Sequence, residues 1–180
     1  AAGCITLTSH NVNAVLRLFD CCGTDTEDPD RIHEIPDPTA DDAPVTIRGG
    51  LITSPDRGIQ RDALVRVSTY QIHVEMYGGT IAGAKTTLDE NPNINTGRGG
   101  GVNGNLTLYG GEISHNYAYV GGGIYTGSDQ SIIKVFGGAV KNNVALRGGG
   151  GIFVFKSLLM SGGEVSGNTA KELWGGGILA

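Results

Sequence analysis

A short glycine-bordered unit recurs along this chain of 180 residues. Each copy has the form apolar-x-apolar-x-Gly-Gly, as in LTLYGG at 106–111 and IKVFGG at 133–138. The Gly-Gly pairs end at residues 50, 79, 111, 138 and 163, so successive pairs are 29, 32, 27 and 25 residues apart. An internal period of this length predicts a repeat architecture, in which each unit buries its apolar face against the next unit.

Two further elements follow the last three Gly-Gly pairs in a constant order. An apolar-x-x-Asn element comes first, and a Gly-Gly-Gly-Ile element comes second. The recurring asparagines are Asn116, Asn143 and Asn168, and the recurring isoleucines are Ile124, Ile152 and Ile178. Residues 45–50 form an earlier, weaker copy of the unit, and residues 16–22 form a degenerate copy with Asp-Cys in place of Gly-Gly.

Apolar residues alternate with other residues inside each unit, which is the period of half-buried strands and not of helices. Each unit offers three short strands, which in the unit at 106–126 lie around LTLY, EIS and GGIYT. Stacking the units pairs the backbone of each coil with the coils above and below it. The sequence therefore predicts an all-β fold, a parallel β-solenoid with three short strands per coil.

Stacking in register assigns structural roles to the recurring side chains. Glycine suits corners that turn through positive φ and lie directly over the same corner one coil away. Equivalent side chains then form columns, as recorded for stacked in-register strands. We expect an amide ladder of Asn116, Asn143 and Asn168, a column of Ile124, Ile152 and Ile178, and an aromatic stack of Tyr77, Tyr109 and Phe136. The aromatic residues could alternatively form a sugar-binding strip, but structural stacking is the favoured interpretation.

The chain reads as one β-helix domain spanning 1–180, with regular repeats at 74–180 and irregular coils at 1–73. Residues 23–44 are acidic and hold four of the six prolines, so we expect a loop that leaves the solenoid. Residues 84–98 lengthen a second turn. Insertions of this kind emerge on one side of a solenoid.

Charge and cysteine content limit the partners. The formal net charge is −5 and the basic residues are scattered singly, so we expect no nucleic acid partner. No apolar run approaches the roughly 20 residues of a membrane helix, so we expect no membrane span. We expect no metal and no cofactor, because the cysteine spacing matches no zinc site and the acidic segment lacks a calcium loop. Cys4 either forms a disulfide with Cys21 or Cys22, or all three cysteines are reduced and buried.

Strings such as LTLYGGEISHNYAYVGGGIYTG and LLMSGGEVSGNTAKELWGGGI resemble the right-handed parallel β-helix repeats of bacterial surface proteins. These include polymorphic outer-membrane and autotransporter passenger proteins with a pectate-lyase-like fold. The resemblance covers 74–180 well and 1–73 loosely, and the chain departs from it in having Ile or Val where Phe usually precedes x-x-Asn. It implies an extracellular or cell-surface, right-handed β-helix of about six coils that serves as an adhesin, stalk or surface layer, with a carbohydrate or host-surface ligand.

The same fold also supports polysaccharide lyases and hydrolases, and a hydrolase needs two carboxylates about 5 to 10 Å apart. The outward position of the first strand holds no such pair, because it is occupied by Arg17, Thr46, Glu75, Thr107, Lys134 and Leu159. Glu112 and Glu164 follow Gly-Gly pairs, but Ala139 occupies the coil between them. We therefore assign no catalytic residue and expect a non-catalytic scaffold. A protein that binds or degrades polysaccharides is the alternative.

The two termini suggest a mode of assembly. Written tail to head, GGGILA followed by AAGCITL resembles a normal join between repeats. Either the chain is a fragment of a longer solenoid, or subunits form a homo-oligomer by stacking end to end, which gives a filament because the contact does not close.

Overall fold

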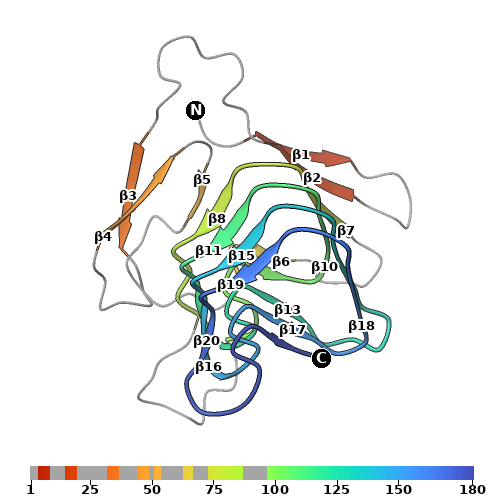
Figure 1. The fold of residues 1–180 in the computed structure, drawn as a ribbon. Helices are drawn as coiled ribbons and strands as arrows, with labels where there is room; N and C mark the ends of the chain where they lie inside the picture. Colours follow the sequence, from red (N-terminus) through yellow and green to blue (C-terminus); the bar gives the residue numbers. More distant parts are fainter. Residues whose placement is uncertain are drawn as a thin grey trace.

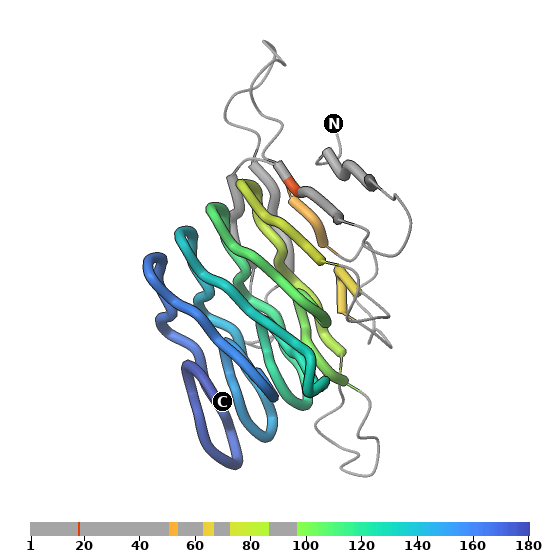
Figure 2. Tube along the Cα trace, turned by 90° about the vertical axis from the view of Figure 1, so that its right-hand side faces the viewer, coloured from red at the N-terminus to blue at the C-terminus, as the bar shows by residue number. Residues whose placement is uncertain are grey.

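A computed structural model describes residues 51–53, 63–66, 73–86 and 97–180 in full. It also describes the backbone of four strands, at 4–8, 15–19, 32–36 and 44–48, and the side chain of Leu18. No described residue belongs to a helix, and strands from successive repeats lie side by side in parallel (Figures 1 and 2). The prediction of an all-β fold with parallel strand stacking is confirmed.

The first sheet contains the apolar-x-apolar strand of each repeat. Its order is β1 (Cys4–Thr8), β2 (Val15–Phe19), β7 (His73–Met76), β10 (Asn105–Leu108), β14 (Ile132–Val135) and β18 (Ser157–Met160). All neighbours from β2 to β18 are parallel, and Leu106 is opposite both Val74 and Ile133. The degenerate copy at 16–22 thus supplies its apolar residues to this sheet in the expected register.

Three further sheets complete each coil. The second contains β5 (Leu51–Ile52), β8 (Thr80–Ala82), β11 (Glu112–Ser114), β15 (Ala139–Lys141) and β19 (Glu164–Ser166). The third contains β12 (Tyr117–Val120), β16 (Val144–Gly148) and β20 (Thr169–Ala170). The fourth contains β6 (Val65–Arg66), β9 (Val102–Asn103), β13 (Ile124–Thr126), β17 (Ile152–Val154) and β21 (Ile178–Leu179).

A coil is one pass of the chain through these four sheets, as made by residues 105–126, 132–154 and 157–179. Figure 2 shows these coils as successive slanted turns, with the last one, in blue, at one end. The segments around LTLY, EIS and GGIYT contain β10, β11 and β13, but the predicted repeat of three strands per coil is not confirmed. The coil also contains a fourth strand, β12, which the sequence analysis missed because YAYV follows the asparagine corner without an intervening glycine.

The core is a set of aliphatic columns enclosed by the four sheets. Val74, Leu106 and Ile133 on the first sheet are fully buried, as are Ile81 and Ile113 on the second. Their in-register neighbours above and below are of the same apolar kind. Burying one such side chain contributes about 1.5–3 kcal/mol, so the columns provide the main stabilisation between coils.

The copy at residues 45–50 does not form a first-sheet strand, which corrects the sequence analysis. Residues 44–48 form β4 (Pro44–Arg48), which pairs antiparallel with β3 (Ile32–Pro36) in a separate sheet of two strands. The acidic segment 23–44 is therefore not wholly a loop, because it contains β3. Because β2 already occupies the first sheet, the described residues that follow the Gly-Gly pair, Leu51–Ile52, join the stack through the second sheet.

The direction of β1 also differs from the expectation drawn from the termini. A tail-to-head join requires residues 4–8 to continue the solenoid as a parallel strand. Instead, β1 is antiparallel to β2, with Cys4 opposite Phe19 and Thr8 opposite Val15. This antiparallel strand lies at the edge of the first sheet.

Candidate functional site

The three recurring asparagines form a continuous hydrogen-bonded column, the asparagine ladder. Asn116 Nδ2 donates to Asn143 Oδ1 at 3.0 Å, and Asn143 Nδ2 donates to Asn168 Oδ1 at 3.0 Å. Each Asn Oδ1 also accepts the backbone N–H of the preceding coil, from Ala84, Asn116 and Asn143 respectively. Asn116 and Asn143 are fully buried. A buried amide is stable only when its donors and acceptor are satisfied, and this column satisfies them between coils.

A second set of amide bonds ties the ladder to the second sheet. Asn116 Nδ2 donates to the carbonyl of Ile81 at 3.0 Å, and Asn143 Nδ2 donates to that of Ile113 at 2.8 Å. The residue before each ladder asparagine has positive φ, which is 51° at His115 and 53° at Asn142. Few side chains adopt this left-handed region, and Asn and His are among those that adopt it most often. The residue types at 115 and 142 therefore fit the sharp corner that turns the next asparagine inward.

The isoleucine column lies on the fourth sheet. Ile124 is opposite Ile152, and Ile152 is opposite Ile178, all in parallel register. Ile124 and Ile152 are fully buried, whereas Ile178 is partly exposed because no described coil lies beyond it. The column is structural in the described coils.

The aromatic stack lies on the outer side of the first sheet, directly after its strands. The Tyr77 and Tyr109 rings are stacked with centroids 4.7 Å apart and planes at 11°, and Tyr109 and Phe136 are 5.5 Å apart at 31°. A sugar ring binds an aromatic residue through the exposed ring face, but both faces of Tyr109 are occupied by its neighbours. The geometry therefore supports structural stacking, which contributes about 0.5–1.5 kcal/mol per pair.

A second outer row of rings was not found from the sequence. Tyr125 stacks on Phe153 with centroids 5.2 Å apart, and the Arg98 guanidinium lies 5.7 Å from the Tyr125 centroid. Tyr125 and Phe153 each follow the Gly-Gly-Gly-Ile element by one residue, so the spacing contained the signal. Arg98 is the last residue of the insertion at 84–98, in which Lys85 and Arg98 bridge to Tyr117 and Val120 of the third sheet.

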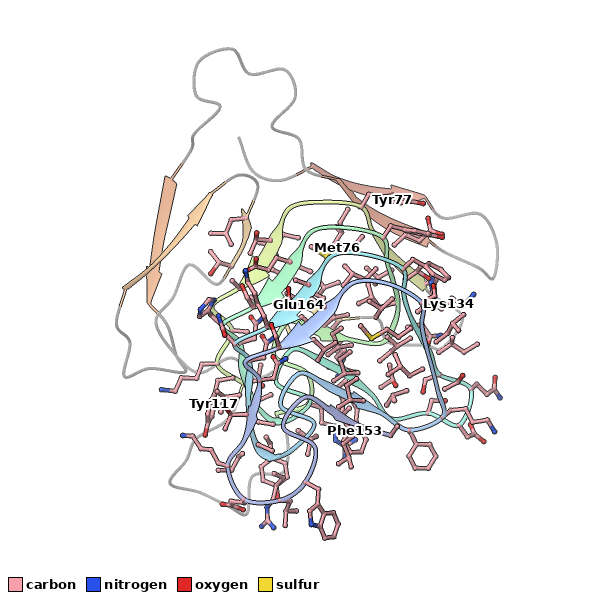
Figure 3. All side chains as sticks on the ribbon, viewed as in Figure 1. Met76, Tyr77, Tyr117, Lys134, Phe153 and Glu164 are labelled. Carbon is pink, nitrogen blue, oxygen red and sulfur yellow. The ribbon has the colours of Figure 1, made fainter. Side chains whose placement is uncertain are left out.

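The outer side of the first sheet also carries a polar group that the sequence analysis did not assign. His73 Nε2 and Thr107 Oγ1 lie 2.5 Å apart on adjacent strands, and Tyr77 donates to Glu75 Oε2 at 3.1 Å. Burial lowers the pKa of His73, Glu75 opposes that effect, and Lys134 adds to it. Figure 3 shows Tyr77 and Lys134 on this outer side, with Met76 directed inward. Thr107, predicted to point outward, is buried beneath these neighbours.

The two candidate carboxylates do not form a pair. Glu112 and Glu164 are both in register with Ala139, one on each side of it, so a full coil separates them. Glu112 Oε2 instead forms an ion pair with Lys141 Nζ at a distance of 2.7 Å. Hydrolysis of a glycosidic bond needs two carboxyl groups that flank the same bond. This arrangement provides no such pair at these two positions.

Several predicted features lie outside the described residues. These are Cys21 and Cys22 with the side chain of Cys4, the acidic positions between the described strands of 23–44, and residues 87–96 of the second insertion. Within the described part of the chain, no group of three or more His, Cys, Asp or Glu side chains could hold a metal ion.

Comparison with known proteins gives no family assignment. No protein-family model, curated protein or solved structure matches this chain. Among the described residues there is no helix with the length and apolar character needed to cross a membrane.

Proposed function

We propose that this chain is a non-catalytic structural scaffold, a right-handed parallel β-helix of about six coils. The supporting observation is the asparagine ladder. It uses the recurring polar residues Asn116, Asn143 and Asn168 to join one coil to the next, and Asn116 and Asn143 are fully buried. The repeats therefore supply shape and rigidity, and the groups that vary between coils face outward.

An extracellular, adhesin-like role is the second part of the proposal. It is supported by the resemblance of residues 74–180 to the repeats of bacterial surface β-helix proteins. In this role the inserted segments at 23–44 and 84–98 provide specificity for a carbohydrate or host-surface ligand, because they interrupt the repeats whereas the coils are uniform. A rigid scaffold positions such loops precisely enough for recognition.

Glycan screening tests the non-catalytic assignment. The chain is incubated with a panel of polysaccharides, and both binding and the release of reducing ends or unsaturated products are measured. We expect no turnover. Turnover that disappears in Glu112→Gln or Glu164→Gln, while the far-ultraviolet circular dichroism is unchanged, would overturn the scaffold assignment.

A polysaccharide-binding or polysaccharide-degrading protein is the second candidate. The observation that favours it is the polar group on the outer side of the first sheet, where His73 contacts Thr107 and Glu75 contacts Tyr77. Glu75→Gln retains the size and hydrogen-bonding capacity of the side chain but removes its charge. Loss of glycan binding or turnover in this variant, with Glu164→Gln unaffected, would favour this candidate over the scaffold.

Stacking of whole chains into a fibre is the assembly raised by the terminal sequences. In parallel tail-to-head stacking, the last coil of one chain would have to pair with the first sheet of the next chain. The edge strand of that sheet is β1, which is antiparallel to its neighbour β2, so it would have to be displaced. We therefore expect the chain to remain monomeric across a concentration series in light scattering. Fibres in negative-stain microscopy would contradict this expectation.

A further inference from the structure

Hydrogen bonds between coils have a fixed direction at the Gly-Gly-Gly corner. Gly122 N–H donates to the carbonyl of Gly149 at 3.0 Å, and Gly150 N–H donates to that of Gly175 at 2.9 Å. The backbone N–H of each ladder asparagine points the same way, since that of Asn143 donates to Asn168 Oδ1. At this corner, every coil therefore requires acceptors from the coil that follows it.

The coil of residues 157–179 presents these donors without acceptors. No acceptor in the described part of the chain faces the N–H groups of Gly175, Gly176 and Gly177, or the backbone N–H of Asn168. Figures 1 and 2 place this coil at one end of the stack. We call this end the open face. Strands β18, β19, β20 and β21 are the edge strands of all four sheets there.

The centre of the open face is apolar. Met160 and Ile178 are 39% and 36% exposed, and Leu158 and Val165 are only partly buried. The residues opposite them in the preceding coil are completely or almost completely buried: Val135, Ile152, Ile133 and Val140. The open face thus combines an apolar centre with a corner of unpaired donors.

The glycines of this coil provide an independent observation. A β-carbon at Gly151 would lie 2.7 Å from the carbonyl oxygen of Gly177 and 2.8 Å from Asn168 Nδ2, so the next coil requires glycine there. A β-carbon at Gly177 would meet nothing closer than a Val165 methyl at 3.6 Å. Gly177 has no positive φ to explain it either. Glycine at 177 is therefore required by nothing in the described structure, yet it is what a following coil requires.

We propose that the open face docks one further parallel β-coil of the same repeat, with an asparagine at the ladder position. The contact continues the interface that already joins coil 132–154 to coil 157–179, with the same donors, columns and glycine corner. A small anion could accept from the glycine N–H groups but would leave Met160 and Ile178 exposed. The inference depends on the stacked architecture of the proposed scaffold, and it does not depend on whether the chain binds or cleaves glycans.

Extending the chain tests this proposal directly. Ala180 is equivalent to Val154, because Ile178 and Leu179 are opposite Ile152 and Phe153. A second copy of residues 155–180 joined after Ala180 therefore continues the repeat without a break. Amide hydrogen exchange is measured for Asn168 and Gly175–Gly177 in the extended and original chains. We expect exchange at least about 100-fold slower in the extended chain, as for amides that open only through cooperative unfolding.

Two variants of the extended chain separate the parts of the contact. Changing the asparagine of the added copy to alanine removes the side-chain acceptor, so Asn168 should lose its protection while Gly175–Gly177 keep theirs. Gly177→Ala should abolish protection at the open face, because the added coil would meet the new methyl. In the original chain the new methyl group of Gly177→Ala has open space around it, so this variant should fold normally. Slow amide exchange at Gly149–Gly151 serves as the control that each variant is folded.

Three results would overturn the proposal. The first is unchanged exchange at Gly175–Gly177 in the extended chain while Gly149–Gly151 remain protected. The second is protection in the original chain that rises with protein concentration, which assigns the open face to a second copy. The third is equal protection of the original chain by inorganic phosphate, which assigns the donors to an anion. Glycan turnover has no bearing on these readings, so failure here is distinguishable from failure of the scaffold assignment.

Discussion

The Asn143 side chain is hydrogen-bonded to Asn168 in the next coil and to Asn116 in the preceding coil, so it joins three consecutive coils. Its Nδ2 donates to Asn168 Oδ1 at 3.0 Å and to the carbonyl of Ile113 at 2.8 Å, while its Oδ1 accepts from Asn116. All these groups are in or beside the core, so removing one side chain leaves several polar atoms unpaired. The same residue type on the surface could be lost at little cost.

Asn143→Ala is therefore expected to destabilise the chain strongly. It leaves the backbone N–H of Asn116 and one of the two N–H groups of Asn116 Nδ2 without an acceptor, and it removes the amide donor from the carbonyl of Ile113. Unsatisfied buried groups cost about 1–3 kcal/mol each, and we expect a total loss of about 3 kcal/mol or more. Urea denaturation followed by circular dichroism measures the loss.

Asn142→Gly is the matched control for that substitution. Asn142 is exposed and has φ 53°, a conformation that glycine adopts without strain. We expect a change within about 0.5 kcal/mol, as for most surface substitutions. If the two variants were equally unstable, the loss would come from the corner and not from the ladder.

Gly151→Ala and Gly177→Ala compare equivalent positions in adjacent coils. At 151 the new methyl would press on the carbonyl of Gly177 and on Asn168 Nδ2, whereas at 177 its nearest neighbour is 3.6 Å away. Overpacking of this kind costs about 1–3 kcal/mol, so Gly151→Ala should lower the midpoint of thermal unfolding and Gly177→Ala should not. Equal midpoints would contradict the close approach of coils at this corner.

Tyr109→Ala should cost more than an ordinary surface substitution because Tyr109 contacts rings on both sides. At about 0.5–1.5 kcal/mol per aromatic pair, we expect a loss of about 1–3 kcal/mol in chemical denaturation. Phe155 is 63% exposed, and Phe155→Ala serves as the control with little expected change. A loss of glycan affinity in Tyr109→Ala without a loss of stability would instead support the sugar-binding interpretation.

Stability should fall as the pH is lowered through the range where histidine titrates. Burial lowers the pKa of His73 below its ordinary value of 6.5. Below that value the unfolded chain binds the proton before the folded chain does, so the free energy of unfolding decreases with falling pH. His73→Gln should reduce this decrease between pH 7 and pH 5, measured by urea denaturation at each pH. An identical pH dependence in both proteins would show that His73 does not contribute.

The regular columns could be predicted from the sequence because each coil repeats its pattern at a nearly constant spacing. Once the strands stack in register, Asn116 and Asn143 must be neighbours, and so must Tyr77 and Tyr109. The same logic applied to Tyr125 and Phe153, which were missed only because the element was noted for its isoleucine. Periodicity identifies which residues are equivalent in the coils.

Periodicity alone could not predict how the irregular N-terminal region joins the stack. The segments at 16–19 and 45–48 both have alternating apolar residues, but only one can occupy the first sheet of that coil. The other pairs antiparallel with β3, and the shared apolar pattern does not distinguish the two outcomes. The antiparallel direction of β1 is likewise not contained in the alternation of its apolar residues. The contact of His73 with Thr107 was also missed. The alternating pattern placed Thr107 at an outward position, but it did not reveal that neighbouring side chains bury Thr107 there.

A crystal structure of the chain tests the central claim most directly. The account predicts that Asn116 Nδ2 to Asn143 Oδ1 and Asn143 Nδ2 to Asn168 Oδ1 are hydrogen-bond distances near 3.0 Å, with parallel strands on either side. Asparagines separated by more than a hydrogen bond, or repeats paired as antiparallel hairpins, would contradict it.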